Sequence, residues 1–517
     1  MRVLMLGWEF PPFITGGLGT ACYGLTRALD RREVEVTFVL PRSIDGDHAS
    51  HVTLVAPGVA RPERGAGATA PATGSAAPDL AAPSALPGGA SSASEPESVA
   101  PAPAAGDGAL ASFARSSRPA GWLPPRIGVL GEPSLPSVYS AGTCGTQTLH
   151  DSWSRALHSE AGPWTGVAEL SPELLARLPA FEAAIRSALP EAAHGGSGDH
   201  GPGGGHDYSG DLIGAADRYA RFVVASCAGL PFDVIHAHDW LTYPAGIAIA
   251  RITGRPLVVH VHSTEFDRSG LHVNQRIYDI ERRGMHAAVR VIAVSMLTKN
   301  LCVNRYGVPA DRIEVVYNGV DLAPEQVGME GIRPKDKIVL YFGRITMQKG
   351  PEYFIHAAKR VLDVYHDVKF VVAGSGDQAQ RMIELAAALG IGHKVLFTGF
   401  LRGKDIARVF ALADLYVMPS VSEPFGIAPL EAMGHDVPVL ISRTSGVSEV
   451  LTHALKCDFW DVDDMADKIV AVLRHPPLQR TLVEHGRFEV RKLTWDGAAA
   501  RCEQVYRTAI AALGRRR

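Results

Sequence analysis

The chain has 517 residues, with 51 Lys and Arg against 54 Asp and Glu, and its formal net charge is −3. This near-neutral balance removes any broad electrostatic case for binding nucleic acid. No apolar run approaches the ~20 residues of a membrane span, and the run after Met1 is too short for a secretory signal. The six cysteines form no C-x-x-C pair, which predicts reduced thiols and a cytoplasmic protein.

Two stretches have a composition unlike the rest of the chain. Residues 61–120 are mostly Ala, Pro, Gly and Ser, and residues 194–210 are mostly Gly, His and Asp. Neither carries enough apolar surface to offset the conformational entropy of ordering it. Without them about 440 residues remain, enough for two large α/β domains or three ordinary ones. Between them, helical spacing at 171–189 predicts one helix.

The first half of the chain alternates between apolar strands and helical patterns. Val3 to Leu6 is continuously apolar, as expected of a strand buried on both faces of a parallel sheet. Strands are predicted at 3–6, 34–40, 51–55, 232–238, 256–262, 290–294 and 313–317, and helices ending at 29, 230, 252, 288 and 306.

The pattern restarts after a link at 323–334 that carries Pro and Gly. Strands are predicted at 338–342, 369–373, 395–398, 415–418 and 437–441, with helical segments between them. Strand, helix and strand in series indicate a parallel sheet with right-handed crossovers.

The expected class is therefore α/β, with two tandem Rossmann-like, doubly wound domains and a ligand between them at the carboxyl ends of the strands. The expected domains are 1–325, with an insert at about 57–210, and 326–490. The rest, 491–517, is expected to be a C-terminal helix packing back toward the first domain.

The loop after the first strand is rich in glycine, including Gly16 and Gly17. Backbone N–H groups of such a loop can approach an anion at a helix N-terminus. The loop lacks the G-x-G-x-x-G pattern of a dinucleotide site, and a tight strand-to-helix turn is the alternative.

Two strands end in alternating histidines, His236 and His238 on one and His260 and His262 on the other. A period of two places each pair on one face of its strand. The pattern supports core residues and functional residues about equally. A metal centre is disfavoured because no carboxylate or cysteine recurs at ligand spacing.

The second half carries a more specific set of charged residues. Arg344 and Lys349, each beside a glycine, lie between a strand and a helix, which predicts a diphosphate site; a solvated basic turn is the alternative. Glu423 follows a strand, and Glu431 is expected two turns into the next helix. Both carboxylates are expected to face one groove, unless Glu423 merely starts the helix and Glu431 is a surface charge.

Three other patterns suggest a metal only weakly. Asp45 and Asp47 fit a turn, and Asp461 and Asp463 fit the N-cap of a helix. The histidines in the Gly-rich stretch fit a linker; they are His194, His200 and His206.

Jointly, the motifs resemble those of the retaining GT-B glycosyltransferases of the glycogen-synthase-like, group 1 superfamily. The resemblance covers nearly the whole chain except about 57–210. It rests on Gly-Gly-Leu at 16–18, His-Ala-His-Asp-Trp at 236–240, Ala-Val-Ser at 293–295, Tyr-Asn-Gly-Val-Asp at 317–321, Gly-Arg-x4-Lys-Gly at 343–350, and two Glu separated by seven residues at 423 and 431.

The resemblance implies a role for each matching residue. The Gly16-Gly17 turn would meet the donor diphosphate, Arg344 and Lys349 would neutralise it as it leaves, and Glu423 would hold hexose hydroxyls. The amides of Gly426 and Ile427 would lie near the phosphate or hexose, and Glu431 would bond the nucleotide ribose. His262 would contact the sugar ring. Asp239 and Trp240 would shape the acceptor side.

The implied activity is transfer of a hexose to an α-glucan or other saccharide, and the first candidate donor is ADP-glucose or UDP-glucose. The transfer would retain the anomeric configuration and would need no cofactor or divalent metal. Ile14 departs from the Lys that glycogen synthases usually place before T-G-G-L, so the donor and acceptor stay open. Alternatives are a same-fold transferase to a small phosphorylated or lipid-linked acceptor, a nucleotide-sugar epimerase, and a silent nucleotide-sugar-binding protein.

Overall fold

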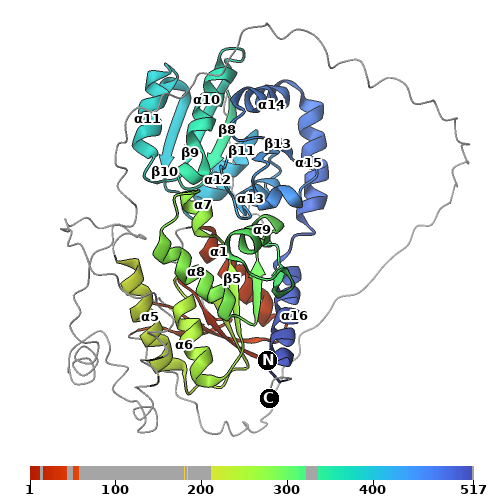
Figure 1. The fold of residues 1–517 in the computed structure, drawn as a ribbon. Helices are drawn as coiled ribbons and strands as arrows, with labels where there is room; N and C mark the ends of the chain where they lie inside the picture. Colours follow the sequence, from red (N-terminus) through yellow and green to blue (C-terminus); the bar gives the residue numbers. More distant parts are fainter. Residues whose placement is uncertain are drawn as a thin grey trace, which may run out of the picture. The chain divides into compact units, whose positions relative to one another are not determined.

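A computed structural model describes residues 1–11, 16–42, 50–57, 211–321 and 336–514, together with Ala180 and Ala183. Within these ranges the chain forms two parallel sheets flanked by helices, which confirms the expected α/β class (Figure 1). The predicted boundary near 325 lies outside the described residues, as does the predicted helix at 171–189 apart from those two alanines.

The first sheet has the strand order β3-β2-β1-β4-β5-β6-β7, and every pairing in it is parallel. Its strands are β1 (Arg2–Leu6), β2 (Glu35–Val39), β3 (Thr53–Val55), β4 (Val234–His238), β5 (Leu257–Val261), β6 (Arg290–Ala293) and β7 (Ile313–Val315). The accompanying helices are α1 (Gly17–Asp30), α5 (Leu212–Cys227), α6 (Tyr243–Thr253), α7 (Glu265–Ser269), α8 (Gln275–Ala287) and α9 (Met296–Tyr306).

The second sheet has the order β10-β9-β8-β11-β12-β13 and is also parallel. Its strands are β8 (Lys337–Phe342), β9 (Val368–Ala373), β10 (Val395–Gly399), β11 (Leu415–Met418), β12 (Val439–Ser442) and β13 (Leu455–Cys457). The helices are α10 (Pro351–Leu362), α11 (Ala379–Ala388), α12 (Lys404–Leu412), α13 (Ala428–Gly434), α14 (Val462–Arg474), α15 (Pro476–Val490) and α16 (Trp495–Gly514).

Strand order reverses once in each sheet, between β1 and β4 and between β8 and β11. At such a point the crossovers before and after run to opposite faces, and parallel sheets bind their ligands outside the carboxyl ends of the two strands. The candidate residues of the sequence fall largely on the loops after these four strands.

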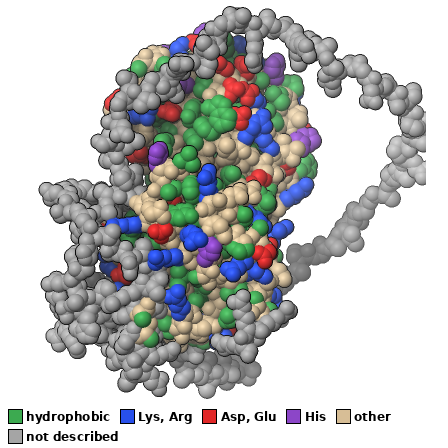
Figure 2. Space-filling view, in the orientation of Figure 1, with side chains coloured by type: hydrophobic (Ala, Val, Ile, Leu, Met, Phe, Trp, Pro, Cys, Tyr) green, Lys and Arg blue, Asp and Glu red, His purple; other side chains and the backbone are tan. Residues whose placement is uncertain are grey.

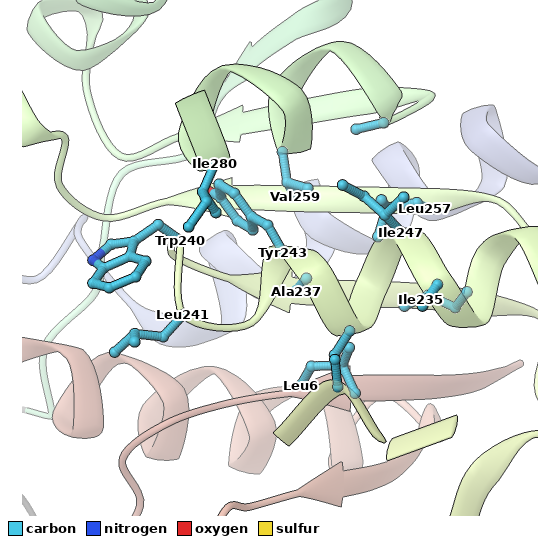
Figure 3. Packing of buried hydrophobic residues seen from close by; sticks show 14 of the residues in the cluster. Leu6, Ile235, Ala237, Trp240, Leu241, Tyr243, Ile247, Leu257, Val259 and Ile280 are labelled. Carbon is cyan, nitrogen blue, oxygen red and sulfur yellow. The ribbon is translucent and has the colours of Figure 1, made fainter. Parts of the chain in front are cut away.

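Alternation along β4 and β5 sends side chains to two separate cores. Ile235 and Ala237 join the cluster beneath α5 and α6, where Tyr243 of α6 packs against the sheet (Figure 3). Val234 and Val258 point to the other face and join a cluster that includes Tyr506 of α16. The histidines of β4 and β5 share this second face.

The last helix, α16, packs against the first sheet and α1 (Figure 1). Trp495 and Tyr506 are buried in the same cluster as Phe38 of β2. Arg31 and Arg32, at the end of α1, pair with acidic residues of α16 at 2.9 and 2.8 Å. The first core is therefore completed by the end of the chain.

Acidic and basic side chains are interspersed over the visible side of the described residues, so this side has no patch of a single charge (Figure 2). No helix in the described part of the chain is long and apolar enough to cross a bilayer. The five cysteines in the described ranges are all buried, and none of them forms a disulfide; they are Cys22, Cys227, Cys302, Cys457 and Cys502.

Gly24 of α1 tests the packing of α16. A Cβ at this position would lie 2.2 Å from Cε2 of Trp495. We expect Gly24→Ala to lower the free energy of unfolding by about 1–2 kcal/mol, because overpacking outweighs the gain of about 1 kcal/mol in helix propensity. Urea denaturation checks this, with the exposed and uncrowded Gly229→Ala as control. Equal stability of the two variants would contradict the packing.

Candidate active site

An ion pair joins the loops that follow β8 and β11. Lys349 donates to Oε2 of Glu423 at 2.6 Å, and the two side chains are 22% and 9% exposed. The Ser420 hydroxyl donates to the same carboxylate oxygen at 3.3 Å. The structure thus brings together two of the predicted site residues, beside the switch point of the second sheet.

Backbone contacts hold these two loops together. The amide of Val421 donates to the carbonyl of Gln348 at 2.9 Å, and the Gln348 side chain donates to the carbonyl of Ser422 at 3.1 Å. Gly350 has φ +63°, and a Cβ there would lie 2.1 Å from the carbonyl oxygen of Pro419. Only glycine fits this close approach, which sets the position of Lys349 beside it.

Gly426 begins the turn into α13, with φ +100° and the position of a Cβ 3.2 Å from Cγ of Glu423. Ile427 is the N-cap of α13. Glu431 is the fourth residue of this seven-residue helix, so the expectation that it lies two turns in is wrong. The helix starts later than predicted because the Pro-Phe-Gly turn runs on to Ile427.

The Glu431 carboxylate lies in surroundings that disfavour its charged form. Burial raises its pKa to about 7. Burial first, and then the charges of Glu423 and Glu431, raise the pKa of the Tyr416 hydroxyl. The charges of both carboxylates therefore act on one buried tyrosine. Perturbed acids of this kind concentrate at functional sites.

Arg344 is the exposed cation of the site. Its carbonyl accepts from the Tyr341 hydroxyl at 2.8 Å, while its guanidinium has no hydrogen-bond partner among the described residues. Burial and the charge of Glu423 raise the pKa of Tyr341, and Arg344 opposes the rise. A guanidinium left open on the loop that also carries Lys349 can receive an anion.

A third loop, after β9, packs against the residue that follows Arg344, and it was not predicted to be part of the site. The amide of Ile345 donates to the carbonyl of Ser375 at 2.9 Å, and the amide of Gln378 donates to the carbonyl of Ile345 at 3.0 Å. Gly376 lies so close that a Cβ would meet the Ile345 carbonyl at 2.2 Å. The available signal was the Gly-Ser-Gly-Asp run at 374–377, directly after a strand.

The four histidines, on β4, on β5 and just after β5, form two hydrogen-bonded pairs between the strands. The two histidines of each strand share one face, as their spacing predicts. His238 Nδ1 lies 2.8 Å from His262 Nε2, and His236 Nε2 lies 3.2 Å from His260 Nδ1. Nδ1 of His236 lies 2.6 Å from the Tyr506 hydroxyl. Burial lowers the pKa of His236 and His262 to about 3, and lowers the pKa of the other two histidines well below the usual value. All four are neutral near pH 7.

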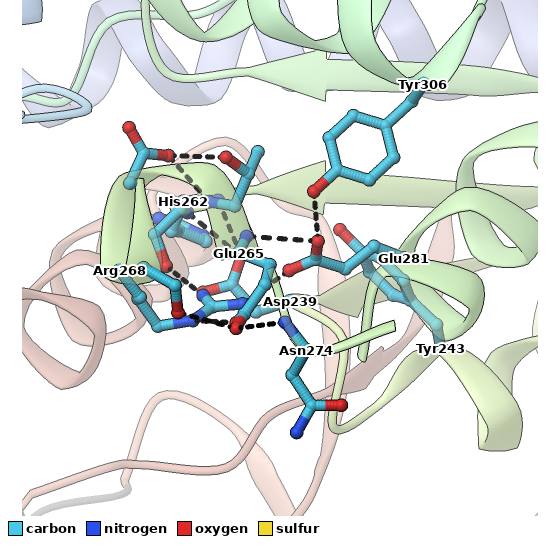
Figure 4. Close-up of polar contacts among 12 residues, drawn as sticks. Asp239, Tyr243, His262, Glu265, Arg268, Asn274, Glu281 and Tyr306 are labelled. Atoms are coloured by element: carbon cyan, nitrogen blue, oxygen red, sulfur yellow. Dashed lines mark hydrogen bonds and ion pairs between the residues drawn. The ribbon is translucent and has the colours of Figure 1, made fainter. Parts of the chain in front are cut away.

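Asp239 and Trp240 follow β4. Asp239 has φ +57°, and its Oδ1 accepts from the amides of His262 at 2.7 Å and Ser263 at 3.3 Å, so it holds the turn that carries His262 (Figure 4). Burial raises its pKa to about 7. Trp240 is 4% exposed and belongs to the core. The structure therefore places both beside the β5 turn, with the indole packed inward.

Charged residues support the segment after β5, where the short helix α7 went unpredicted. Arg268 donates to Glu265 at 3.1 Å and to Glu281 at 2.5 Å, and Glu281 also accepts from the Tyr306 hydroxyl (Figure 4). Glu265 and Glu281 are 0% and 1% exposed. The paired charges fix α7 just past His262.

Several hydrogen bonds link the loops of the first sheet to those of the second. Ser422, next to Glu423, donates to Oδ1 of Asp267 in α7 at 2.6 Å. Glu449 accepts from the amides of Met296 and Leu297 at 2.8 and 2.7 Å, at the N-terminus of α9. Among the described residues, no hydrogen bond joins His262 directly to Lys349 or Glu423.

Gly16 and Gly17 start α1 with open space around them, and no acidic residue lies in its first turn. Asp461 is the N-cap of α14 and accepts from the amide of Asp464, which confirms that prediction. The other doubtful patterns fall outside the described residues; they are Ile14, Asp45, Asp47, His194, His200 and His206.

Comparison with known proteins places the chain in a family. Residues 324–488 match the glycosyl transferases group 1 family, 184–324 match glycosyltransferase family 4, and 2–61 match the starch synthase catalytic domain. An uncharacterized glycosyltransferase of Methanocaldococcus jannaschii is 33% identical over 303 residues, which cover 55% of this chain and 77% of the relative. The chain is a group 1 glycosyltransferase.

Other relatives of this glycosyltransferase differ in their named activities. Glycogen synthase of Mycobacterium tuberculosis is 27% identical, covering 53% of this chain and 68% of the relative. A D-inositol 3-phosphate glycosyltransferase of Pseudarthrobacter chlorophenolicus is 29% identical, covering 54% and 71%.

Solved structures confirm the GT-B fold of the glycosyltransferase. Sucrose-phosphate synthase of Thermosynechococcus elongatus aligns with a TM-score of 0.61 at 17% identity, over 99% of this chain and 100% of the other. HepE of Anabaena in complex with UDP aligns with a TM-score of 0.50 at 21% identity, over 56% and 82%.

The raised pKa of Glu431 makes stability of the glycosyltransferase depend on pH. The folded pKa of about 7 lies above the unfolded value of about 4.5, so the group costs stability increasingly as pH rises from 4.5 to 7. We expect Glu431→Gln to be more stable than wild type by about 1–3 kcal/mol at pH 8, with the difference vanishing near pH 4.

Urea denaturation at the two pH values measures the effect, with exposed Glu484→Gln as the matched control. A difference between Glu431→Gln and wild type that is the same at both pH values would contradict a raised pKa.

Proposed function

We propose that the chain is a retaining hexosyltransferase that works without a divalent metal or cofactor. It moves a hexose, with glucose leading, from a nucleoside-diphosphate donor to an α-glucan or other saccharide. Buried cysteines that form no disulfide in the described ranges support a reducing compartment, and we place the enzyme in the cytoplasm.

The observation that carries the proposal is the Lys349–Glu423 pair at the switch point between β8 and β11. A cation and a carboxylate held 2.6 Å apart suit a nucleotide sugar, which presents an anionic diphosphate next to neutral hydroxyls. The exposed guanidinium of Arg344 adds the second positive charge that a diphosphate requires.

In this proposal the protein acts mainly by stabilising charge on the leaving group. Lys349 and Arg344 neutralise the departing diphosphate, and fixed cations do so without reorganising during the reaction. Glu423 accepts hydrogen bonds from hexose hydroxyls. A neutral His262 contacts the sugar without repelling its developing positive charge.

The remaining donor contacts are assigned to residues around this pair. Glu431 bonds the ribose, the amides of Gly426 and Ile427 meet the phosphate or hexose, and the amides of Gly16 and Gly17 meet the diphosphate at the start of α1. Asp239 acts on the acceptor side by holding the turn after β5, and Trp240 supports that turn from the core.

A second candidate is transfer to a small phosphorylated acceptor. Relatives named as D-inositol 3-phosphate glycosyltransferases are as similar to the chain as the named glycogen synthase, which favours keeping this acceptor class. A UDP complex among the GT-B neighbours makes a uridine nucleotide the first donor to try.

A donor panel tests the function directly. We expect release of nucleoside diphosphate from at least one of ADP-glucose, UDP-glucose, GDP-mannose and UDP-GlcNAc, and faster release with either glycogen or inositol phosphate present. No release from folded protein in any combination would overturn the transferase. Tight binding without turnover would favour a silent binder, and conversion of UDP-GlcNAc without acceptor would favour an epimerase.

Substitution of the ion pair tests the site. We expect Lys349→Ala and Glu423→Gln each to lower kcat by about 100-fold or more, as for loss of a group that stabilises the transition state. The control is Lys359→Ala on α10, which removes an exposed i,i+4 ion pair. Thermal unfolding shows that each variant is folded, and normal turnover of either site variant would refute the assignment.

A further inference from the structure

The hydrogen bond between His238 and His262 depends on which nitrogen of each ring carries the proton. Nδ1 of His238 bonds to Nε2 of His262 at 2.8 Å, and Nε2 of His238 is buried without a hydrogen-bond partner in the described residues. His238 itself is 0% exposed. A neutral imidazole carries one N–H and one lone pair, so one nitrogen of each ring is a donor and the other an acceptor.

The buried, unpartnered Nε2 of His238 shows which nitrogen of the pair is the donor and which is the acceptor. An N–H buried without an acceptor is among the rarest features of folded proteins, whereas an acceptor without a donor is tolerated more often. Nε2 of His238 is therefore the bare nitrogen, and its proton sits on Nδ1. It follows that Nδ1–H of His238 donates and Nε2 of His262 accepts.

The remaining nitrogen of His262 must then carry the proton. Nδ1 of His262 has no partner in the described part of the chain and is not among the buried unpartnered atoms, so it is the open nitrogen of the pair. We propose that His238 is a positioning residue: it holds His262 in the tautomer that offers an uncharged Nδ1–H donor to the substrate. The substrate part of this inference rests on the proposed function.

A metal ion is the rival explanation for the buried nitrogens. One ring nitrogen from each of His236, His238 and His260 lies within 4.8 Å of the others. Tetrahedral zinc at about 2.0–2.1 Å from each nitrogen needs them about 3.3 Å apart, with lone pairs converging. Instead, the rings of His236 and His238 stack with their centroids 4.2 Å apart and an interplanar angle of 25°. Their lone pairs therefore lie in two offset, nearly parallel planes, which do not meet at the distance of a bound ion. The geometry favours the hydrogen bonds.

The tautomers of the neighbouring pair, His236 and His260, are not fixed in this way. The Tyr506 hydroxyl, bonded to Nδ1 of His236, can donate or accept, so either tautomer of His236 and His260 leaves one hydrogen unpartnered. This difference supplies a control. Tyr506→Phe removes a hydrogen bond from the neighbouring pair without touching the bond that holds His262.

Histidine-selective ¹⁵N labelling of the full chain reads the tautomer without any activity. Long-range ¹H–¹⁵N spectra, assigned with single His variants, should show His262 protonated on Nδ1 and neutral from pH 8 down to pH 5. They should be unchanged by one equivalent of Zn²⁺. Protonation on Nε2, a charged ring, or a zinc-induced shift of His236, His238 and His260 would each overturn the proposal.

Two near-isosteric variants then test the link to turnover, using the donor found active in the panel. Asn can place an N–H where Nδ1 of His238 lies, and Leu cannot. We expect His238→Leu to lower kcat about tenfold with the donor KM within about twofold, and His238→Asn and Tyr506→Phe to stay within about threefold of wild type.

Equal loss in His238→Leu and His238→Asn would refute the positioning role, because a merely structural residue would give that result. If no donor turns over, the proposed function fails while the spectra still decide the tautomer.

Discussion

The reversal of strand order within each parallel sheet is the constraint on which the site depends. Crossovers leave β8 and β11 toward opposite faces, and parallel sheets bind ligands outside the carboxyl ends of the strands at such a point. Lys349 and Glu423 lie there 2.6 Å apart, and their opposite charges offset each other. The same reversal between β1 and β4 places the start of α1 near the turn held by Asp239.

Buried polar groups near these two reversal points are arranged to avoid net charge. The histidines of β4 and β5 are neutral because burial penalises their charged forms, and hydrogen bonds between rings replace those with water. Where charge is kept, as at Arg268 between Glu265 and Glu281, opposite charges lie in direct contact. Glu431 and Asp239 are exceptions, because burial raises the pKa of each carboxylate to about 7. A carboxylate held at a cost to stability is typical of a functional group.

Much of this arrangement could be predicted from the sequence, because continuous apolar strands separated by amphipathic helices define a parallel sheet. The loops bearing Lys349 and Glu423 were predicted from charge and glycine spacing alone. Two short elements, α7 with five residues and β13 with three, were not predicted, because such short segments show no hydrophobic periodicity. Contacts between distant loops, such as Asp267 with Ser422, leave no local signal, and neither does the inward packing of Trp240.

The position of α16 has a consequence for synthesis of the chain. A ribosome releases β1 to β7 first, but one face of their sheet is covered by side chains near the end of the sequence, including Trp495 and Tyr506. During translation that apolar face waits while about 180 further residues are made, among them the whole second sheet. The nascent first half therefore presents a natural binding surface for chaperones until the final helix emerges from the exit tunnel.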